Sequence, residues 1–148
     1  MIIHKNKPTL LPDMPRNETE MGSFPTEWHV LKLKEIFDFK NGINFTREQK
    51  GESGVLTVDD LNMYEEGIYV STKNLYRVKK ELTEDYLLKK GDILFVRSSL
   101  KREGIGCTSL FRESQEPVTF CGFLIRARPK SNIVYPEYIT NYLRTNKA

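Results

Sequence analysis

The stretch GDILFVRSSLKREGIG, residues 91–106, carries the clearest structural pattern in this chain. Its residues from Ile93 to Val96 are all apolar, and turn-forming residues lie on both sides of them. A strand with one face in water alternates apolar and polar residues, whereas a strand covered on both faces does not. The run therefore predicts a buried central strand, and the polar residues from Arg97 to Gly106 predict an exposed loop after it.

The segments before this strand are short and interrupted by turn residues. Residues 1–23, with Pro8, Pro12 and Pro15, predict an irregular N-terminal arm. The other elements predicted upstream are a short strand beginning at Trp28 and Val30, a helical turn around Leu33, Ile36 and Phe37, a turn at Asn41-Gly42, a strand at 55–58, a strand in the front part of 68–78, and a short helix from Thr83 to Lys89–Lys90 that ends at Gly91.

The segments after it predict two more strands and one helix. The strands cover 105–111 and 117–128, and Gly122 inside the second indicates a bulge or a close approach of another chain segment. Pro136 favours the first position of a helix that runs to about Arg144. The predicted fold is a single strand-rich α+β domain over residues 24–148, with short helices and a C-terminal helix.

Composition excludes several classes of protein. The chain has 148 residues, of which 39% are hydrophobic, and no apolar run approaches the roughly 18 residues of a membrane helix. The N-terminus lacks the apolar core of a signal peptide, so we expect a soluble cytoplasmic protein without membrane contact. Cys107 and Cys121 are expected to be free thiols, although neighbouring strands would let them pair. With His4 and His29 they show no zinc spacing, and we expect no metal and no cofactor.

Charge is distributed unevenly along the chain. The formal net charge is only +3, but residues 1–70 carry 8 Lys/Arg against 12 Asp/Glu, while residues 71–148 carry 15 against 8. A basic half is typical of a surface that binds a polyanion such as DNA. Scattered surface lysines would give the same count, so composition alone leaves both interpretations open.

Two patterns resemble catalytic sites. Ser98 and Lys101 have the Ser-x-x-Lys spacing that places an amine beside a nucleophile on one helix face, but here they lie in a predicted loop without companion motifs. Asp38, Glu48 and Lys50 imitate the carboxylate–carboxylate–lysine set of metal-dependent nucleases, in which two acids bind a hard cation. The stretch around Glu48 lacks strand alternation, so a solvated loop is favoured and the nuclease remains an alternative.

Polar and cationic residues follow several predicted strands and form the stronger candidate site. Arginine and asparagine suit paired contacts to base edges, while lysine and serine suit phosphates. The residues that we select as candidate DNA contacts are Lys40, Asn41 and Asn44 in one loop, Lys73, Asn74 and Arg77 in a second, and Arg97, Ser98, Ser99, Lys101 and Arg102 in a third. A solvated face that contacts nothing remains the competing interpretation.

Three blocks of the sequence resemble the target-recognition domains of specificity (S) subunits from type I restriction–modification systems. The blocks are PTEWHVLKLKEIFDFKNG, through Pro25, Trp28, Leu33, Ile36 and Gly42; LLKKGDILFVRS, through Gly91, Asp92 and Arg97; and VTFCGFLIRARPKSNIVYPEYITNYLRT, through Gly122, Phe123, Ile125, Arg126, Pro136, Tyr138, Tyr142 and Leu143. They appear in the family's order and span about residues 24–145.

The resemblance implies a domain that reads duplex DNA and has no catalytic activity of its own. Subunits of this family commonly hold two such domains, each reading half of a bipartite target, separated by long helices that dock methyltransferase (M) subunits. Methyl transfer and restriction then belong to partner M and R subunits, and this sequence lacks a glycine-rich methyl-donor loop. It stops at Lys147-Ala148, before the spacer helix and second domain of the full family pattern.

A third alternative is a protein-interaction fragment that pairs with a specificity subunit. In that case the C-terminal helix would present Ile139, Tyr142 and Leu143 to the partner.

Overall fold

The computed structural model describes residues 15–99 and 102–145. The chain divides into two compact units, one up to Leu33 and one from Lys34 onward. In the first unit, strands β1 (Arg16–Thr19) and β2 (Gly22–Pro25) form an antiparallel hairpin, and Phe24 stacks on Trp28 with ring centroids 6.1 Å apart. Thr19 donates its hydroxyl hydrogen to the Gly22 carbonyl, and Gly22 has a φ of +118° that favours glycine.

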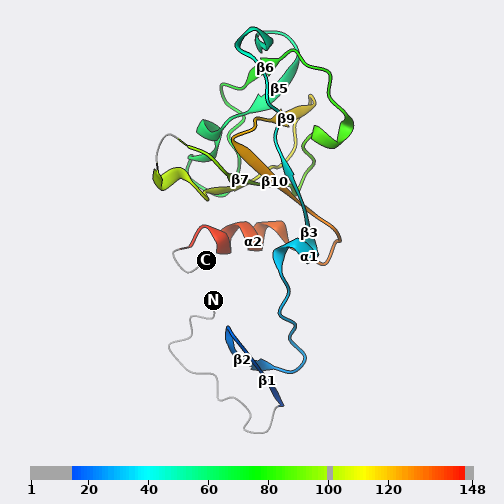
Figure 1. Ribbon diagram of the computed structural model, residues 1–148, viewed down its shortest axis with the longest axis vertical. Helices are drawn as coiled ribbons and strands as arrows, with labels where there is room; N and C mark the ends of the chain where they lie inside the picture. The colour runs from blue at the N-terminus through cyan, green and yellow to red at the C-terminus, as the bar shows by residue number, and fades with distance from the viewer. Residues whose placement is uncertain (1–14, 100–101, 146–148) are drawn as a thin grey trace. The chain divides into compact units, whose positions relative to one another are not determined.

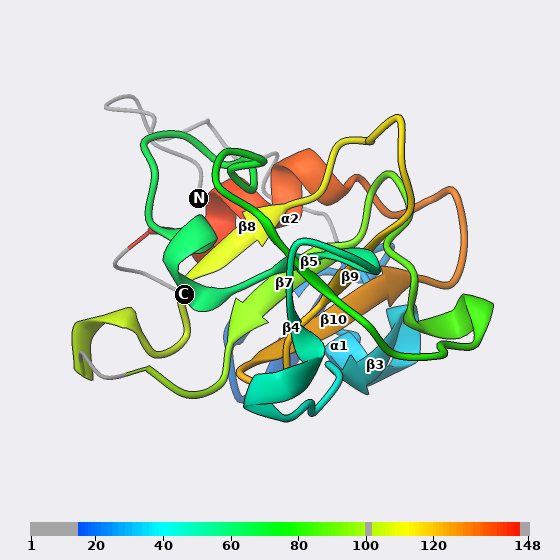
Figure 2. The same cartoon turned by 90° about the horizontal axis from the view of Figure 1, so that it is seen from above.

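The second unit consists of two four-stranded sheets and a helix in three layers (Figures 1 and 2). The first sheet has the order β3-β10-β7-β8 and is antiparallel throughout; the second has the order β4-β6-β5-β9, in which β5 and β9 are parallel. The strands are β3 (Phe37–Asn41), β4 (Lys50–Gly51), β5 (Val55–Val58), β6 (Tyr76–Val78), β7 (Ile93–Val96), β8 (Thr108–Leu110), β9 (Val118–Phe120) and β10 (Leu124–Pro129). The helices are α1 (Leu33–Ile36) and α2 (Pro136–Leu143), and the 3₁₀ turns are η1 (Arg47–Gln49), η2 (Asp60–Met63), η3 (Glu84–Tyr86) and η4 (Arg102–Gly104).

Strand β7 is the buried central strand that its apolar run predicts. It pairs with β10 on one side and β8 on the other, and apolar cores cover both of its faces. Leu94 and Val96 face the core between the two sheets, together with residues such as Phe120 of β9. Ile93 faces a second core, in which Ile139 of α2 packs against the opposite face of the sheet.

The Gly-Asp pair before β7 has two structural functions. Gly91 has a φ of +90°, a conformation that side chains other than glycine's rarely adopt. Asp92 is 1% exposed, and its carboxylate accepts two hydrogen bonds from Arg128 of β10, at 2.7 and 2.8 Å, and one of 2.7 Å from the Lys89 amide. The hydrogen bond to Asp92 raises the pKa of Arg128. Asp92 therefore fixes the turn into β7 to the adjacent strand.

Two predicted features are confirmed closely. Gly122 is a point of close approach, because a Cβ atom there would lie 2.3 Å from Asn44 Oδ1. It also separates β9 from β10, which belong to different sheets, so the single strand predicted at 117–128 is two strands.

Helix α2 begins at Pro136 and is followed by Arg144, as predicted. Arg144 Nη1 donates to the Thr108 carbonyl of β8 at 2.6 Å.

Other predicted elements differ from the structure. Residues 16–23, which lie in the arm expected to be irregular, belong to the hairpin of polar strands described above. No strand begins at Trp28, and in 68–78 the strand lies at the back, over 76–78, where aromatic and β-branched residues pair with β4 and β5. The helix expected from Thr83 is only the 3₁₀ turn η3, in which the Thr83 side chain makes no cap hydrogen bond. The strand predicted at 105–111 is confined to β8.

Candidate nucleic-acid interface

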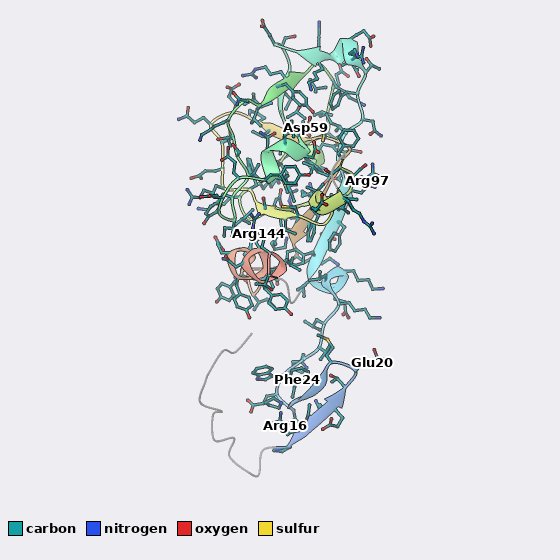
Figure 3. All side chains as sticks on the ribbon, turned by 90° about the vertical axis from the view of Figure 1, so that its left-hand side faces the viewer. Arg16, Glu20, Phe24, Asp59, Arg97 and Arg144 are labelled. Atoms are coloured by element: carbon teal, nitrogen blue, oxygen red, sulfur yellow. The ribbon has the colours of Figure 1, made fainter. Side chains whose placement is uncertain are left out.

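The connection from β7 to β8 emerges at one edge of the second unit, where Figure 3 labels Arg97. Arg97 Nη2 donates to the Gly122 carbonyl at 2.6 Å, and the Arg97 amide donates to the Phe123 carbonyl at 2.8 Å. Ser98 is exposed beside it. Arg102 is exposed in η4, and its guanidinium makes no hydrogen bond or ion pair among the described residues. Lys101 lies outside the described residues.

The segment after β3 lies against the same glycine turn. Ile43 forms a bridge with Cys121, and Asn44 Oδ1 lies against the Cα of Gly122. The Asn44 carbonyl accepts a 2.6 Å hydrogen bond from Lys80 Nζ. Two predicted loops that are far apart in the sequence, represented by Asn44 and Arg97, therefore meet at Gly122.

The third predicted loop is a tight turn between η2 and β6. Lys73 and Asn74 are exposed at its tip, and Asn74 has a φ of +57°, which asparagine tolerates better than most residues. The Lys73 carbonyl accepts a 3.1 Å hydrogen bond from Asn62 Nδ2. The two tip residues border a hollow of about 470 Å³ that Lys50 and Tyr76 also line.

Asp59 is the lining residue of this hollow whose pKa the surroundings change most clearly below its ordinary value. Burial opposes ionisation of Asp59, but hydrogen bonds from Asp60 outweigh it and lower the pKa of Asp59. Burial, together with the neighbouring Asp59, raises the pKa of Asp60. Burial also raises the pKa of Cys121 to about 12, with the Asp59 charge adding to the effect. The hollow is thus lined by the carboxylates of Asp59 and Glu65, by two lysines and by the Asn74 amide. This mixture suits hydrogen-bonding partners with both donors and acceptors.

Two candidate cations are engaged with carboxylates. Lys40 Nζ contacts Asp85, and this hydrogen bond lowers the pKa of the Asp85 carboxyl. Arg77 Nη2 donates to both carboxylate oxygens of Glu116, at 2.8 and 3.0 Å. Asn41 is exposed at the end of β3. The cations at Lys73 and Arg102 carry no such carboxylate partner among the residues that the structure describes.

Residues 25–148 match the family described as Type I restriction modification DNA specificity domain. The chain belongs to this family. As a DNA specificity domain it is not the catalytic component of such a system. No helix among the described residues is long and apolar enough to cross a membrane.

Individual relatives agree with this assignment. The chain is 28% identical over 130 residues to the "Putative type I restriction enzyme MjaX specificity subunit" of Methanocaldococcus jannaschii, which covers 86% of this chain and 30% of the relative. It is 33% identical over 98 residues to the MjaVIII specificity subunit of the same organism, covering 60% of this chain and 20% of that one. The chain thus spans less than a third of either relative.

Solved structures show the same fold. The HsdS subunit from Thermoanaerobacter tengcongensis superposes with a TM-score of 0.61 at 14% identity, over 81% of this chain and 28% of that one. A chain from a study of complex assembly and conformational transition in a type I R-M system gives a TM-score of 0.60 at 15% identity, over 88% of this chain and 30% of that one.

The nuclease set does not form a common site in this specificity domain. Asp38 lies 3.7 Å from Lys130 in an exposed ion pair, and Lys50 Nζ lies over the Tyr76 ring, 3.7 Å from its centroid. Glu48 is exposed in η1, where a hydrogen bond from the Thr46 side chain lowers its pKa. Among the described residues, no group of three or more His, Cys, Asp or Glu could hold a metal ion.

The C-terminal helix of the domain presents a different face from the one predicted. Ile139 packs in the second core, and Leu143 is half-buried. Of the three predicted residues, only Tyr142 is exposed, and it shares the exposed face with Tyr138.

Sequence reasoning missed two residues behind the candidate loops. Asn62 is buried and Tyr64 donates its hydroxyl hydrogen to Ser99 Oγ at 3.0 Å. The pattern Asp59-x-x-Asn62 could have indicated the first, because a side chain three residues after a cap commonly bonds back to the cap amide. Asn62 Oδ1 does so, accepting from the Asp59 amide at 2.9 Å. No local pattern indicates the contact of Tyr64.

Proposed function

We propose that this domain reads one half of a bipartite duplex DNA sequence and thereby directs partner methyltransferase and restriction subunits to that site in the cytoplasm. The relatives that it matches are specificity subunits more than three times its matched length, so the second half of the target would be read elsewhere. The domain's contribution would be sequence discrimination, without a cofactor.

One observation supports this proposal best: contacts within the fold link all three predicted loops. Gly122 lies between Asn44 and Arg97, and η2 with Tyr64 lies between the Lys73 turn and Ser99. Loops that read DNA must reach neighbouring base pairs together, and a linked set of loops satisfies this requirement.

The chemistry of the loops divides between phosphates and bases. Arg102, Lys73 and Arg97 would supply salt-dependent affinity for phosphates. Asn74 and Asn44 carry amides that can both donate to and accept from a base edge. The ionised Asp59 in the hollow disfavours a phosphate there and suits the amino group of cytosine or adenine. Lys40 and Arg77, which contact carboxylates, would contribute less.

The direct test is selection of bound sequences from a random duplex library with the native full-length protein in its complex. We expect enrichment of one half-site. Arg102→Ala should weaken binding to that site by roughly ten-fold, the loss of about one charge-assisted contact, while unfolding is unchanged.

Arg112→Ala is the matched control. Arg112 lies beyond the opposite end of β8 and stacks on Tyr69, with 3.7 Å between the guanidinium carbon and the ring centroid. Its substitution should leave DNA affinity unaltered. Failure of the native complex to enrich any sequence would contradict the proposed function, and full affinity after Arg102→Ala would contradict the assignment of that residue.

A further inference from the structure

The two loops that would present Lys73 and Ser99 are fastened to one short stretch of chain, Asp59 to Tyr64. Asn62 is 8% exposed, and both polar atoms of its side chain form hydrogen bonds. Oδ1 accepts from the Asp59 amide at 2.9 Å, and Nδ2 donates to the Lys73 carbonyl at 3.1 Å. The Asn62 carbonyl also accepts from the Ser71 amide at 2.9 Å. One buried residue is thus hydrogen-bonded to two backbone groups of the 71–75 turn.

Tyr64 makes the equivalent contact to the other loop. Its hydroxyl donates to Ser99 Oγ at 3.0 Å. Gly104, two residues after Arg102, lies so close that a Cβ atom would be 2.4 Å from the same hydroxyl and 2.8 Å from Ser99 Oγ. The absence of a side chain at Gly104 is what permits Tyr64 to reach the loop.

The stretch itself is anchored in the protein interior. Met63, between the two contact residues, is buried in the core between the sheets. Its carbonyl accepts from Ser109 Oγ of β8 at 3.2 Å. Asp59 Oδ1 accepts from the Asp60 amide at 2.8 Å at the start of η2. The residues that contact the two loops therefore belong to a stretch that the core and β8 hold in place.

We infer that Asn62 and Tyr64 are positioning residues for DNA readout, which hold the 71–75 turn and the Ser99 loop in one geometry without touching DNA themselves. This inference rests on the proposed function. Base-edge hydrogen bonds tolerate little displacement, and a loop that is ordered before binding loses less entropy on binding. Phosphate contacts through long cationic side chains tolerate more displacement. Loss of the two internal contacts should therefore reduce discrimination between sequences more than general affinity for DNA.

The test compares Tyr64→Phe and Asn62→Ala with the native full-length complex. Both substitutions retain every charge. We expect each to lower the ratio of affinities for the selected half-site and an unrelated duplex by roughly five-fold, the effect of one ordinary hydrogen bond. Affinity for the unrelated duplex and its salt dependence should not change. Tyr138→Phe, on the exposed face of α2, is the matched control and should leave the ratio intact.

Each outcome separates the two hypotheses. If the native complex prefers a sequence and both variants retain the full ratio, the inference fails while the proposed function stands. If a variant loses affinity equally for both duplexes, the contact serves general binding or folding, and the inference fails again. If the native complex shows no preference, the proposed function fails and the inference with it. Because Asn62 is buried, Asn62→Ala could prevent folding, and the nearly isosteric Tyr64→Phe then decides.

Discussion

At the scale of single residues, Asp92 shows how a buried charge can be satisfied. Its carboxylate accepts from two nitrogens of Arg128 and from a backbone amide. A buried carboxylate without such partners would be strongly unfavourable, and a planar guanidinium is the side chain that matches both of its oxygens. The Gly-Asp pair of the sequence is therefore a structural feature of the fold.

Asp92→Asn should be strongly destabilising. It removes the charge that compensates Arg128 and replaces an acceptor by a donor that faces the guanidinium. We expect the free energy of unfolding in urea to fall by about 3 kcal/mol. Asp38→Asn is the matched control, because Asp38 and Lys130 form an exposed pair, and it should cost less than about 0.5 kcal/mol. Equal effects of the two substitutions would contradict this account.

A second residue-scale prediction concerns Gly42. A Cβ atom there would lie 2.0 Å from the Cys121 carbonyl oxygen, and the backbone cannot move aside as a flexible side chain could. Gly42→Ala should therefore lower the free energy of unfolding by about 2 kcal/mol or more. Gly51→Ala, where nothing lies within 4 Å of the added atom, should have little effect. A stable Gly42→Ala protein would show that the 42–44 and 121–122 segments are not in contact.

At the scale of elements, η3 is fixed to the first sheet through Asp85. The Asp85 carboxylate contacts Lys40 of β3, and its carbonyl accepts a 2.5 Å hydrogen bond from Arg126 of β10. Arg126 is 3% exposed and lies opposite Lys40 in the register of the two strands. Asp85 thus offsets two neighbouring cations, which explains why Lys40 is engaged within the fold.

This arrangement predicts a pH dependence. Because the hydrogen bond from Lys40 lowers the pKa of Asp85, its stabilising contribution is complete above the ordinary pKa of about 4 and is lost as the pH falls through the lower folded value. Asp85→Asn should lower the Tm at pH 7, and the difference from the native protein should shrink below about pH 4. Glu81→Gln, an exposed carboxylate on the same segment, should change the Tm little. A difference for Asp85→Asn that is constant from pH 7 to pH 3 would refute the pairing.

At the scale of the whole molecule, the modest net charge conceals a basic half. The candidate loops carry Lys73, Arg97, Lys101 and Arg102, all from the part of the chain with excess cations. The acidic N-terminal half contributes Asp59 and Glu65 to the hollow that Lys73 borders. Affinity for DNA would then come from a few lysine and arginine side chains in the loops, and not from a positive potential spread over the whole surface.

The predicted consequence is a moderate salt dependence. Three phosphate contacts, from Lys73, Arg97 and Arg102, give a slope of about −2.7 for log K against log salt concentration. Lys73→Gln should make the slope shallower by about 0.9. Lys90→Gln, which removes an exposed lysine beside Gly91 and α2, should not. A slope near zero, or equal changes for both variants, would mean that the loops do not contact phosphates.

Much of the fold could be predicted from local pattern. The apolar run at 93–96 became β7, 55–58 became β5, and Pro136 opened α2, because burial, strand propensity and helix-start chemistry are each expressed within a few residues. The hairpin at 16–25 was missed because its strands are polar and show no apolar alternation. The strand at 76–78 was missed because it is only three residues long, and its pairing with β4 and β5 sets its position.

The sequence by itself determined the central strand, the C-terminal helix and the resemblance to DNA specificity domains, and it favoured the free cysteines. It also named loop residues that could contact DNA, because arginine, lysine and asparagine have that capacity wherever they lie. Only the tertiary structure decided that Arg77 and Lys40 face carboxylates, that Asn44 and Arg97 meet at Gly122, and that Asn62 and Tyr64 join two loops. The physical reason is that such contacts join residues far apart in the sequence, 45 positions in the case of Lys40 and Asp85, and no local pattern specifies which distant group a side chain will meet.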